Sequence, residues 1–263
     1  MIRYREIRPS ARLRPFVHTF WILEHDGEEG VQRVVPDGHS ELILNWASRS
    51  KRSKTAGGGG SRVVFLAGQI DGPLLLRPAG PAKMLGIGFQ PHGAASVFSQ
   101  PMHELSGRFT PVEDLSRQLS RGLNDALDSH DPIAAVESAL LSAENKVCGG
   151  DLLIAEAARR ITLGKGALDL AALARELGLS IRQLERRFLA AVGLSPKLFC
   201  RIQRFNNVFH VLGQPSCNWV ETAVASGYYD QAHLIRDCKD LSGNTPAILL
   251  AEDADLARHF YQQ

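Results

Sequence analysis

The sequence predicts an α+β protein of two domains. The N-terminal domain is expected to be a β-sandwich or small barrel followed by helices, and the C-terminal domain to be all-α, with two helix-turn-helix units joined by a linker helix. Three observations predict this fold: short apolar runs separated by turn residues up to about residue 92, a helical period that begins at Gly93, and one Ala and Gly pattern that occurs twice near the end. The 263 residues suffice for two domains, each with its own core.

The composition is typical of a globular protein. Hydrophobic residues make up 44% of the chain and charged residues 22%, with a mean hydropathy of −0.11. The cysteines form no Cys-x-x-Cys pair, residues 1–5 form no apolar signal segment, and every apolar run is shorter than the about eighteen residues that span a bilayer. We therefore expect a cytoplasmic protein with reduced thiols and no membrane partner.

Strands are expected over about residues 1–92. Apolar runs at 41–46, 63–67 and 84–89 have the length of strands, and Pro36-Asp37-Gly38 supplies a tight turn because Gly tolerates positive φ. Residues 48–61, which include four consecutive glycines, have too little apolar surface to order themselves and are expected to form a solvated, mobile loop.

Helices are expected over about residues 93–147, at 94–100, 112–127 and 132–143, with Pro111 and Pro132 suited to first helical turns. The paired glycines at 149–150 are a natural hinge, so the domain boundary is expected at 147–150. We assign residues 1–147 to the N-terminal domain and 151–263 to the C-terminal domain.

The first helix-turn-helix unit is predicted at about 169–192. Ala174 is a small residue that lets two helices approach, and Gly178 ends the first helix where a positive φ is required. Ser180 begins the next helix, with Gln183 three residues later as the second member of a capping box.

The second unit is predicted at about 218–242. Ala223 and Gly227 repeat the spacing of the first unit, and Asp230 is suited to cap the helix that follows. The inner stripe of that helix consists of Leu234, Cys238 and Leu241. A single match is equally compatible with an ordinary antiparallel helix pair, whereas two matches in tandem are much more specific.

The segment between the units predicts a linker helix from Pro196 to about Leu212. It would be about 25 Å long, which is of the order of the about 34 Å between successive major-groove turns on one side of B-DNA. Residues 180–204 contain six basic side chains and one acidic side chain, although the net charge of the whole chain is only +2. A solvated helix face is the alternative interpretation of this basic stretch.

Short motifs in the C-terminal domain carry a family resemblance. The motifs are residues 184–188, Gly193-Leu194-Ser195-Pro196, Arg204, residues 227–233 and Gly243-Asn244-Thr245-Pro246. Over about residues 151–250 the chain resembles the DNA-binding domain of AraC/XylS-family transcription regulators. Residues 14–17, 35–38 and 74–78 resemble the cupin-like domain found in front of some of these regulators. The resemblance implies a sequence-specific DNA-binding regulator whose N-terminal domain senses a small molecule of unknown identity or mediates self-association.

The second unit departs from the family pattern. The family usually has Phe at the positions of Leu234 and Cys238, and an aliphatic residue at the position of Thr222. Smaller core residues lose burial free energy, so we expect the second unit to be marginally stable without DNA.

Base-reading residues are expected on the first recognition helix, at Arg182, Glu185 and Arg186. They lie at i, i+3 and i+4 near the helix N-terminus, opposite the inner residues. Arg bonds bidentately to guanine and Glu accepts a hydrogen bond from cytosine, which suits a half-site that contains G·C pairs. A surface cluster of ion pairs is the alternative.

The corresponding positions of the second recognition helix are Gln231, Ala232, Ile235 and Arg236. Ile235 lies away from the inner stripe and is suited to contact a thymine methyl group, or alternatively to pack on a neighbouring helix. Phosphate contacts, which set register without carrying sequence information, are expected from Arg187, Lys197, Arg201, His233 and Lys239. For His233 we expect a structural or phosphate-contacting role rather than metal binding. The basic residues of 48–61 could contact DNA phosphates, with a solvated loop as the alternative interpretation.

The expected partners are double-stranded DNA, a small-molecule effector, a second copy of the chain and, if the protein is an activator, RNA polymerase. The competing hypothesis is a metal-binding protein or a cupin-type enzyme. Against it, the histidines of the N-terminal domain have no His-x-His or His-Glu-x-x-His spacing, Gly86-x-Gly88 lacks the third glycine of a dinucleotide site, and Ser96 and Ser99 have no nucleophile-elbow context. We expect no catalytic residues, no metal and no cofactor.

Overall fold

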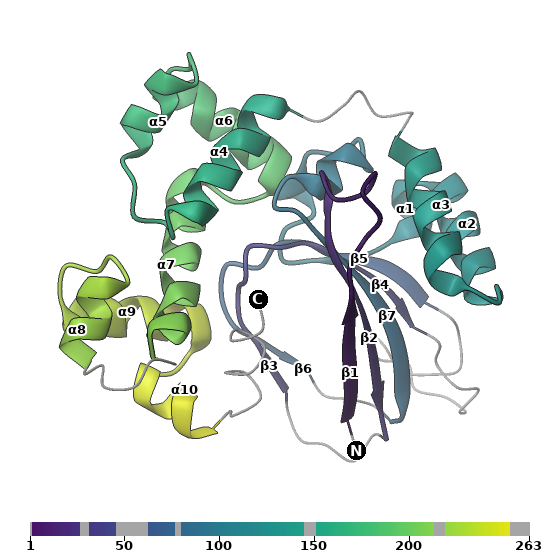
Figure 1. Ribbon diagram of the computed structural model, residues 1–263, viewed down its shortest axis with the longest axis horizontal. Coiled ribbons are helices and arrows are strands. Elements are labelled where there is room, and N and C mark those ends of the chain that lie inside the picture. Colours follow the sequence, from purple (N-terminus) through teal and green to yellow (C-terminus); the bar gives the residue numbers. More distant parts are fainter. Residues whose placement is uncertain are drawn as a thin grey trace.

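The computed structural model describes residues 2–26, 32–45, 63–76, 80–144, 151–212 and 219–252. The predicted loop at 48–61 and the predicted boundary at 147–150 lie outside these residues. Sheets and helices of the N-terminal region stand beside a helical C-terminal region, so the α+β class with an all-α C-terminal domain is confirmed (Figure 1).

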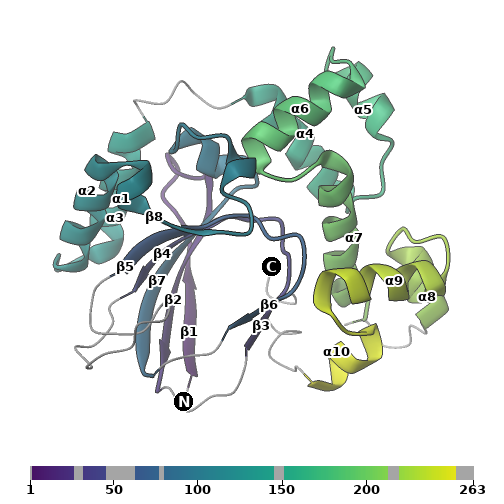
Figure 2. The same ribbon diagram turned by 180° about the vertical axis from the view of Figure 1, so that it is seen from behind.

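The N-terminal region is built on a six-stranded antiparallel sheet. Its order is β1 (Ile2–Ile7), β2 (Val17–His25), β7 (Ala82–Phe89), β4 (Glu41–Asn45), β5 (Val63–Ala67) and β8 (Phe109–Pro111). A second, two-stranded sheet pairs β3 (Gln32–Val34) with β6 (Leu74–Leu76). In both ribbon views this small sheet lies between the large sheet and the C-terminal helices (Figures 1 and 2).

One face of the large sheet forms the N-terminal core. Alternate residues of its strands point to this face, and Phe20, Leu42 and Leu85 are fully buried there. The same cluster includes residues of α2 (Arg117–Leu127) and α3 (Pro132–Glu144), such as Leu123 and Leu140. These helices cover the face together with α1 (Val112–Leu115) (Figures 1 and 2).

Three details differ from the sequence-based expectation. The strands do not end at residue 92, because β8 pairs with β5 at the edge of the sheet. The expected helix at 94–100 is only a short 3-10 turn, η1 (Gly93–Ser96), followed by η2 (Met102–Glu104). The expected helix at 112–127 is interrupted at Ser116, which has extended backbone and uses its hydroxyl to cap α2.

The C-terminal region contains seven helices among the described residues. They are α4 (Leu152–Leu163), α5 (Leu170–Glu176), α6 (Ile181–Val192), α7 (Pro196–Leu212), α8 (Trp219–Ala225), α9 (Gln231–Ser242) and α10 (Pro246–Glu252). The predicted capping box of Ser180 and Gln183 is present, and Asp230 caps α9 as predicted. Gly178 and Gly227 have φ values of 68° and 81°, which is why Gly is required at both bends.

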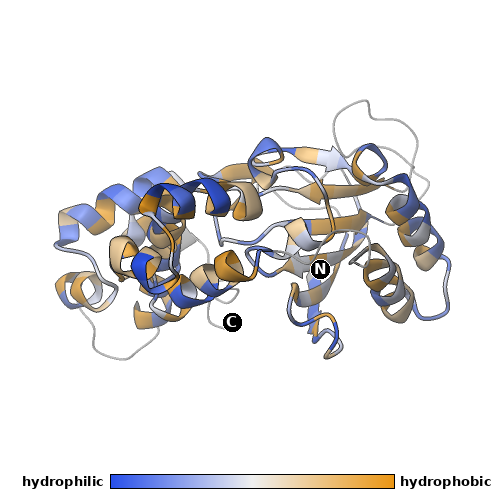
Figure 3. Ribbon diagram, turned by 90° about the horizontal axis from the view of Figure 1, so that it is seen from above, coloured by the Kyte–Doolittle hydropathy of each residue, from blue (hydrophilic) through white to orange (hydrophobic). Residues whose placement is uncertain are grey.

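A single apolar core joins both helix-turn-helix units to α7. Phe188 of α6, Phe199 and Phe205 of α7 and Leu234 of α9 are all fully buried in it. Hydrophobic and hydrophilic residues occur together in these helices, as expected for amphipathic helices with one apolar side (Figure 3). Within the described ranges, no helix has both the length and the apolar character needed to cross a membrane.

Candidate DNA interface

The first recognition helix, α6, has a polar outer face. Leu184 and Phe188 are fully buried on its inner side, whereas Arg182, Glu185 and Arg186 are all exposed. Among the residues that the structure describes, these three form no ion pair, so the interpretation as a surface salt-bridge cluster receives no support. Their side chains are therefore accessible to a ligand.

The second recognition helix, α9, has the same arrangement. Its inner residues Leu234 and Cys238 are fully buried, and Gln231, Ala232 and Arg236 are exposed. Ile235 is half-buried rather than exposed, which agrees with partial packing against the protein. The half-buried ring of His233 packs edge-on against Tyr228, with 5.1 Å between ring centroids.

The five residues predicted to contact phosphates fall into two groups. Lys197 and Lys239 are exposed, and His233 is partly accessible. The guanidinium groups of Arg187 and Arg201 are instead paired with carboxylates inside the domain. Sequence reasoning missed these carboxylates, because each lies 36 residues from its arginine.

Arg187 connects α6 to the start of α4. Its guanidinium donates two hydrogen bonds of 2.6 Å to the two oxygens of Asp151, and Asp151 also accepts from the backbone N–H of Ile154 as the cap of α4. These bonds raise the pKa of Arg187 above its ordinary value. The bidentate geometry fixes the orientation of α6 relative to α4.

Arg201 connects α7 to α9. It pairs with the buried Asp237 and with the exposed Asp240, both at 2.8 Å. Hydrogen bonding to Asp237 is the main reason that the pKa of Arg201 is raised. The linker helix thereby holds the second recognition helix.

Polar groups without a partner gather in the second unit. Among the residues that the structure describes, four buried side-chain atoms of this unit have no hydrogen-bond partner: Thr222 Oγ1, Ser226 Oγ, Tyr228 OH and Asp237 Oδ2. Burial is the main reason that the pKa of Tyr228 is raised, and the Arg204 guanidinium lies 5.8 Å from its ring centroid. Each such buried group lowers the free energy of unfolding, which supports the expectation of a marginal second unit.

On the second face of the large sheet, an aromatic side chain, Trp21, contacts an acidic side chain, Glu41. Gly86 leaves space for the Trp21 indole, whose Nε1 donates a 2.9 Å hydrogen bond to Glu41 Oε1. Burial, together with the nearby charge of Asp37, raises the pKa of Glu41 to about 7. The His18 and His39 rings stack on each other, with 4.9 Å between their centroids.

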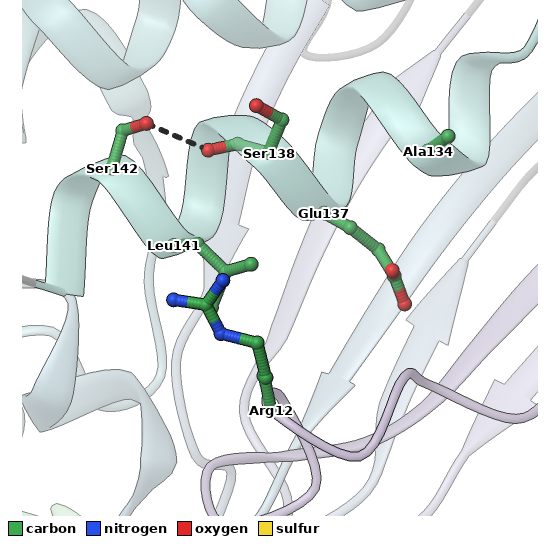
Figure 4. Close-up of a pocket in the computed structure, with 6 residues that line it drawn as sticks. All are labelled: Arg12, Ala134, Glu137, Ser138, Leu141 and Ser142. Atoms are coloured by element: carbon green, nitrogen blue, oxygen red, sulfur yellow. Dashed lines mark hydrogen bonds between the residues drawn. The ribbon is translucent and has the colours of Figure 1, made fainter.

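A hollow in the N-terminal region lies between α3 and Arg12. It is lined by Arg12, Ala134, Glu137, Ser138, Leu141 and Ser142 (Figure 4). Its polar groups are partly occupied already, because Glu137 accepts from Ser10 N–H at 2.7 Å and Ser142 donates to the Ser138 carbonyl. Within the described part of the chain, no three His, Cys, Asp or Glu side chains lie together as a metal site would require.

Comparison with known proteins agrees with this geometry. Residues 173–251 match the family described as a helix-turn-helix domain, and residues 5–111 match a domain of unknown function (DUF6597). No curated protein matches the chain. A 1.65 Å structure of ToxT from Vibrio cholerae is similar, with a TM-score of 0.45 and 11% identity over 88% of this chain and 98% of ToxT. ToxT bound to an unsaturated fatty acid gives a TM-score of 0.37 and 13% identity over 95% and 94% of the two chains.

The family match and the two exposed recognition helices together define the class of domain: residues 173–251 form a helix-turn-helix domain. This match covers most of the segment that resembles the DNA-binding domain of AraC/XylS-family regulators. The resemblance of the N-terminal region to a cupin-like domain stays a prediction.

Proposed function

We propose that the chain is a transcription regulator that binds its operator DNA through the exposed faces of α6 and α9. The observation that carries the proposal is the contrast between the fully buried inner stripes of these helices and their exposed outer faces. Arg182, Glu185 and Arg186 read one half-site. The second half-site is read by Gln231, Ala232, Ile235 and Arg236.

Phosphate contacts in this proposal come from Lys197, Lys239 and His233. Arg187 and Arg201 would have to exchange a carboxylate for a phosphate to act in the same way. We propose that these two arginines instead position α6 and α9, because each joins a recognition helix to a neighbouring helix.

The N-terminal domain, in this proposal, receives the regulatory signal in the cytoplasm, either as a small-molecule effector or through self-association. RNA polymerase is a partner if the protein activates transcription. No catalytic role is assigned to any residue, and the domain boundary is placed at 147–150.

The experiment is selection of the preferred duplex from a random-sequence pool, followed by titration of variants. Arg186→Ala and Arg236→Ala should each cost about 1 to 3 kcal/mol and relax the preference at one base pair. Lys239→Ala should weaken all duplexes alike and reduce the dependence of binding on salt.

The matched control is Arg121→Ala on α2, which removes an exposed arginine far from both recognition helices. It should leave affinity unchanged. Recovery of no preferred sequence by the intact chain would contradict the proposal.

A further inference from the structure

The N-terminal domain contacts the same turn of both helix-turn-helix units. Each recognition helix ends in a left-handed glycine, Gly193 with φ of 90° and Gly243 with φ of 77°. Ser106 Oγ donates a 2.8 Å hydrogen bond to the Gly193 carbonyl, and Arg33 Nη1 donates a 3.1 Å hydrogen bond to the Ser242 carbonyl. Both donors belong to the N-terminal domain, so the C-terminal ends of α6 and α9 are held by one body.

Packing at these turns is close. A Cβ atom added to Gly193 would lie 2.6 Å from Ser106 Oγ and 3.1 Å from the Met102 carbonyl oxygen, and one added to Gly243 would lie 3.6 Å from Pro73. Ser106 and Met102 belong to the segment around η2, and Pro73 directly precedes β6. Two separate parts of the N-terminal domain therefore support the two units.

A third contact reaches α7, the helix between the units. Asn206 Nδ2 and Gln203 Nε2 both donate to the Asp37 carbonyl, at 3.0 and 3.4 Å. Val35, which lies two residues before Asp37, is buried in the core of the C-terminal domain. The loop of residues 35–38 thus docks on the linker helix.

This loop is itself fixed to the large sheet. Gln69 Nε2 donates a 2.7 Å hydrogen bond to the Gly38 carbonyl, and Asp37 Oδ1 accepts from His39 N–H at 2.8 Å. Gly38 has φ of 91°, and a Cβ atom there would lie 2.7 Å from Gln203 Nε2 and 2.8 Å from Phe199 Cε2. Only glycine allows this close approach to α7.

The three contacts leave the reading ends of both helices free. The helices α5 and α8 directly precede α6 and α9 in the two units. In both ribbon views they lie on the side away from the large sheet (Figures 1 and 2). The N-terminal residues of the recognition helices are the ones that enter the major groove. The N-terminal domain can therefore hold the helices without blocking the DNA.

We propose that the N-terminal domain fixes the distance and angle between α6 and α9, so that the regulator selects operators by the spacing of their two half-sites. This inference rests on the proposed DNA-binding function. One added base pair moves the second half-site by about 3.4 Å along the duplex and turns it by about 34°. A pair of recognition helices held at three further points cannot follow that displacement, whereas a pair held only through α7 and the core around it has fewer restraints and adjusts more easily.

The test uses the full chain and the selected duplex, with the spacing between half-sites shortened or lengthened by about one or two base pairs. The wild-type affinity should fall at least about tenfold for each shift, because one half-site loses its base contacts. Gly38→Ala, which pushes the loop off α7, should reduce that penalty to about threefold or less.

Gly80→Ala is the matched control. Gly80 also has a positive φ, 145°, but a Cβ atom there meets nothing within 4 Å. This variant also places a side chain at a positive φ, and Gly80 takes no part in the three contacts, so it should keep the wild-type spacing profile.

A second variant, Arg33→Met with Ser106→Ala, removes the two hydrogen bonds to the recognition helices and adds no bulk. It keeps the test decisive if Gly38→Ala does not fold, and it should also broaden the spacing profile. Unchanged spacing profiles in the folded variants would overturn the inference while leaving the proposed function intact. Absence of sequence-specific binding by the wild-type chain would instead overturn the proposed function.

Discussion

Arg201 of the linker helix donates two hydrogen bonds, of 3.1 and 2.8 Å, to one oxygen of Asp237 on the second recognition helix. The Asp237 side chain is only 5% exposed, and its other oxygen lies 4.0 Å from His233 Nε2, so Arg201 is the nearest cation to this buried carboxylate. Arg201→Ala should lower the free energy of unfolding by about 3 kcal/mol, since it leaves a buried carboxylate without its partner. Urea denaturation followed by circular dichroism measures the loss.

Asp240→Ala provides the comparison for this pair. Asp240 also contacts Arg201 at 2.8 Å, but its side chain is 65% exposed. The expected cost is below about 1 kcal/mol, because water screens the exposed pair. Equal costs for the two variants would show that burial does not govern the contact.

Thr222→Val should stabilise the protein. Thr222 is fully buried, and its hydroxyl has no hydrogen-bond partner among the described residues. Replacement of an unpaired buried hydroxyl by a methyl group of similar size should raise the free energy of unfolding by about 1 kcal/mol. Ser242→Ala should do the opposite, because the Ser242 hydroxyl donates a 2.6 Å hydrogen bond to the Cys238 carbonyl.

Hydrogen exchange should distinguish the two units in the free protein. The second unit contains several buried polar atoms that have no hydrogen-bond partner within the described ranges, and Leu234 and Cys238 fill its core. Amides of residues 231–242 should exchange about tenfold faster than those of 181–192, because local opening costs less there. Bound DNA should slow them, and uniformly slow exchange across 219–242 without DNA would contradict this prediction.

The Glu41 carboxyl should make stability depend on pH. Its pKa is raised from 4.5 to about 7, so the folded protein binds this proton more tightly than the unfolded chain. Stability from this group is therefore present below about pH 4.5 and is lost as the pH rises through about 7.

The size of that effect is bounded by the partial exposure of Glu41. The full shift corresponds to about 3 kcal/mol, and because the side chain is only half-buried we expect about 1 to 2 kcal/mol between about pH 5 and pH 8. Glu41→Gln should remove this part of the pH profile. Parallel unfolding curves for the two proteins across that range would exclude the raised pKa.

Local signals predicted the helical half of the fold well. Helix caps depend on residues next to the helix start. The structure confirms both predicted caps, the capping box of Ser180 and Gln183 and the cap at Asp230. The break at Ser116 differs from the expectation, because the apolar period continues through it, although Ser116 is itself a capping residue whose hydroxyl accepts from Leu119 N–H.

Contacts between distant residues could not be predicted in the same way. Arg33 and Ser242 are 209 residues apart, and no local pattern links them. Arg187 and Arg201 were assigned to phosphates from charge alone, since the sequence does not reveal that Asp151 and Asp237 lie beside them. The exposed candidates on α6 and α9 followed from helical spacing, which a sequence does contain.

The two capping residues also differ in charge, and this has an electrostatic consequence for encounter with DNA. The first turn of an α-helix carries about half a positive elementary charge. Ser180 leaves that partial charge on α6 uncompensated, whereas the Asp230 carboxylate offsets it on α9. Long-range attraction of a polyanion should therefore favour first engagement by the N-terminal unit, and Asp230→Asn, which preserves a capping side chain, should speed association with every duplex.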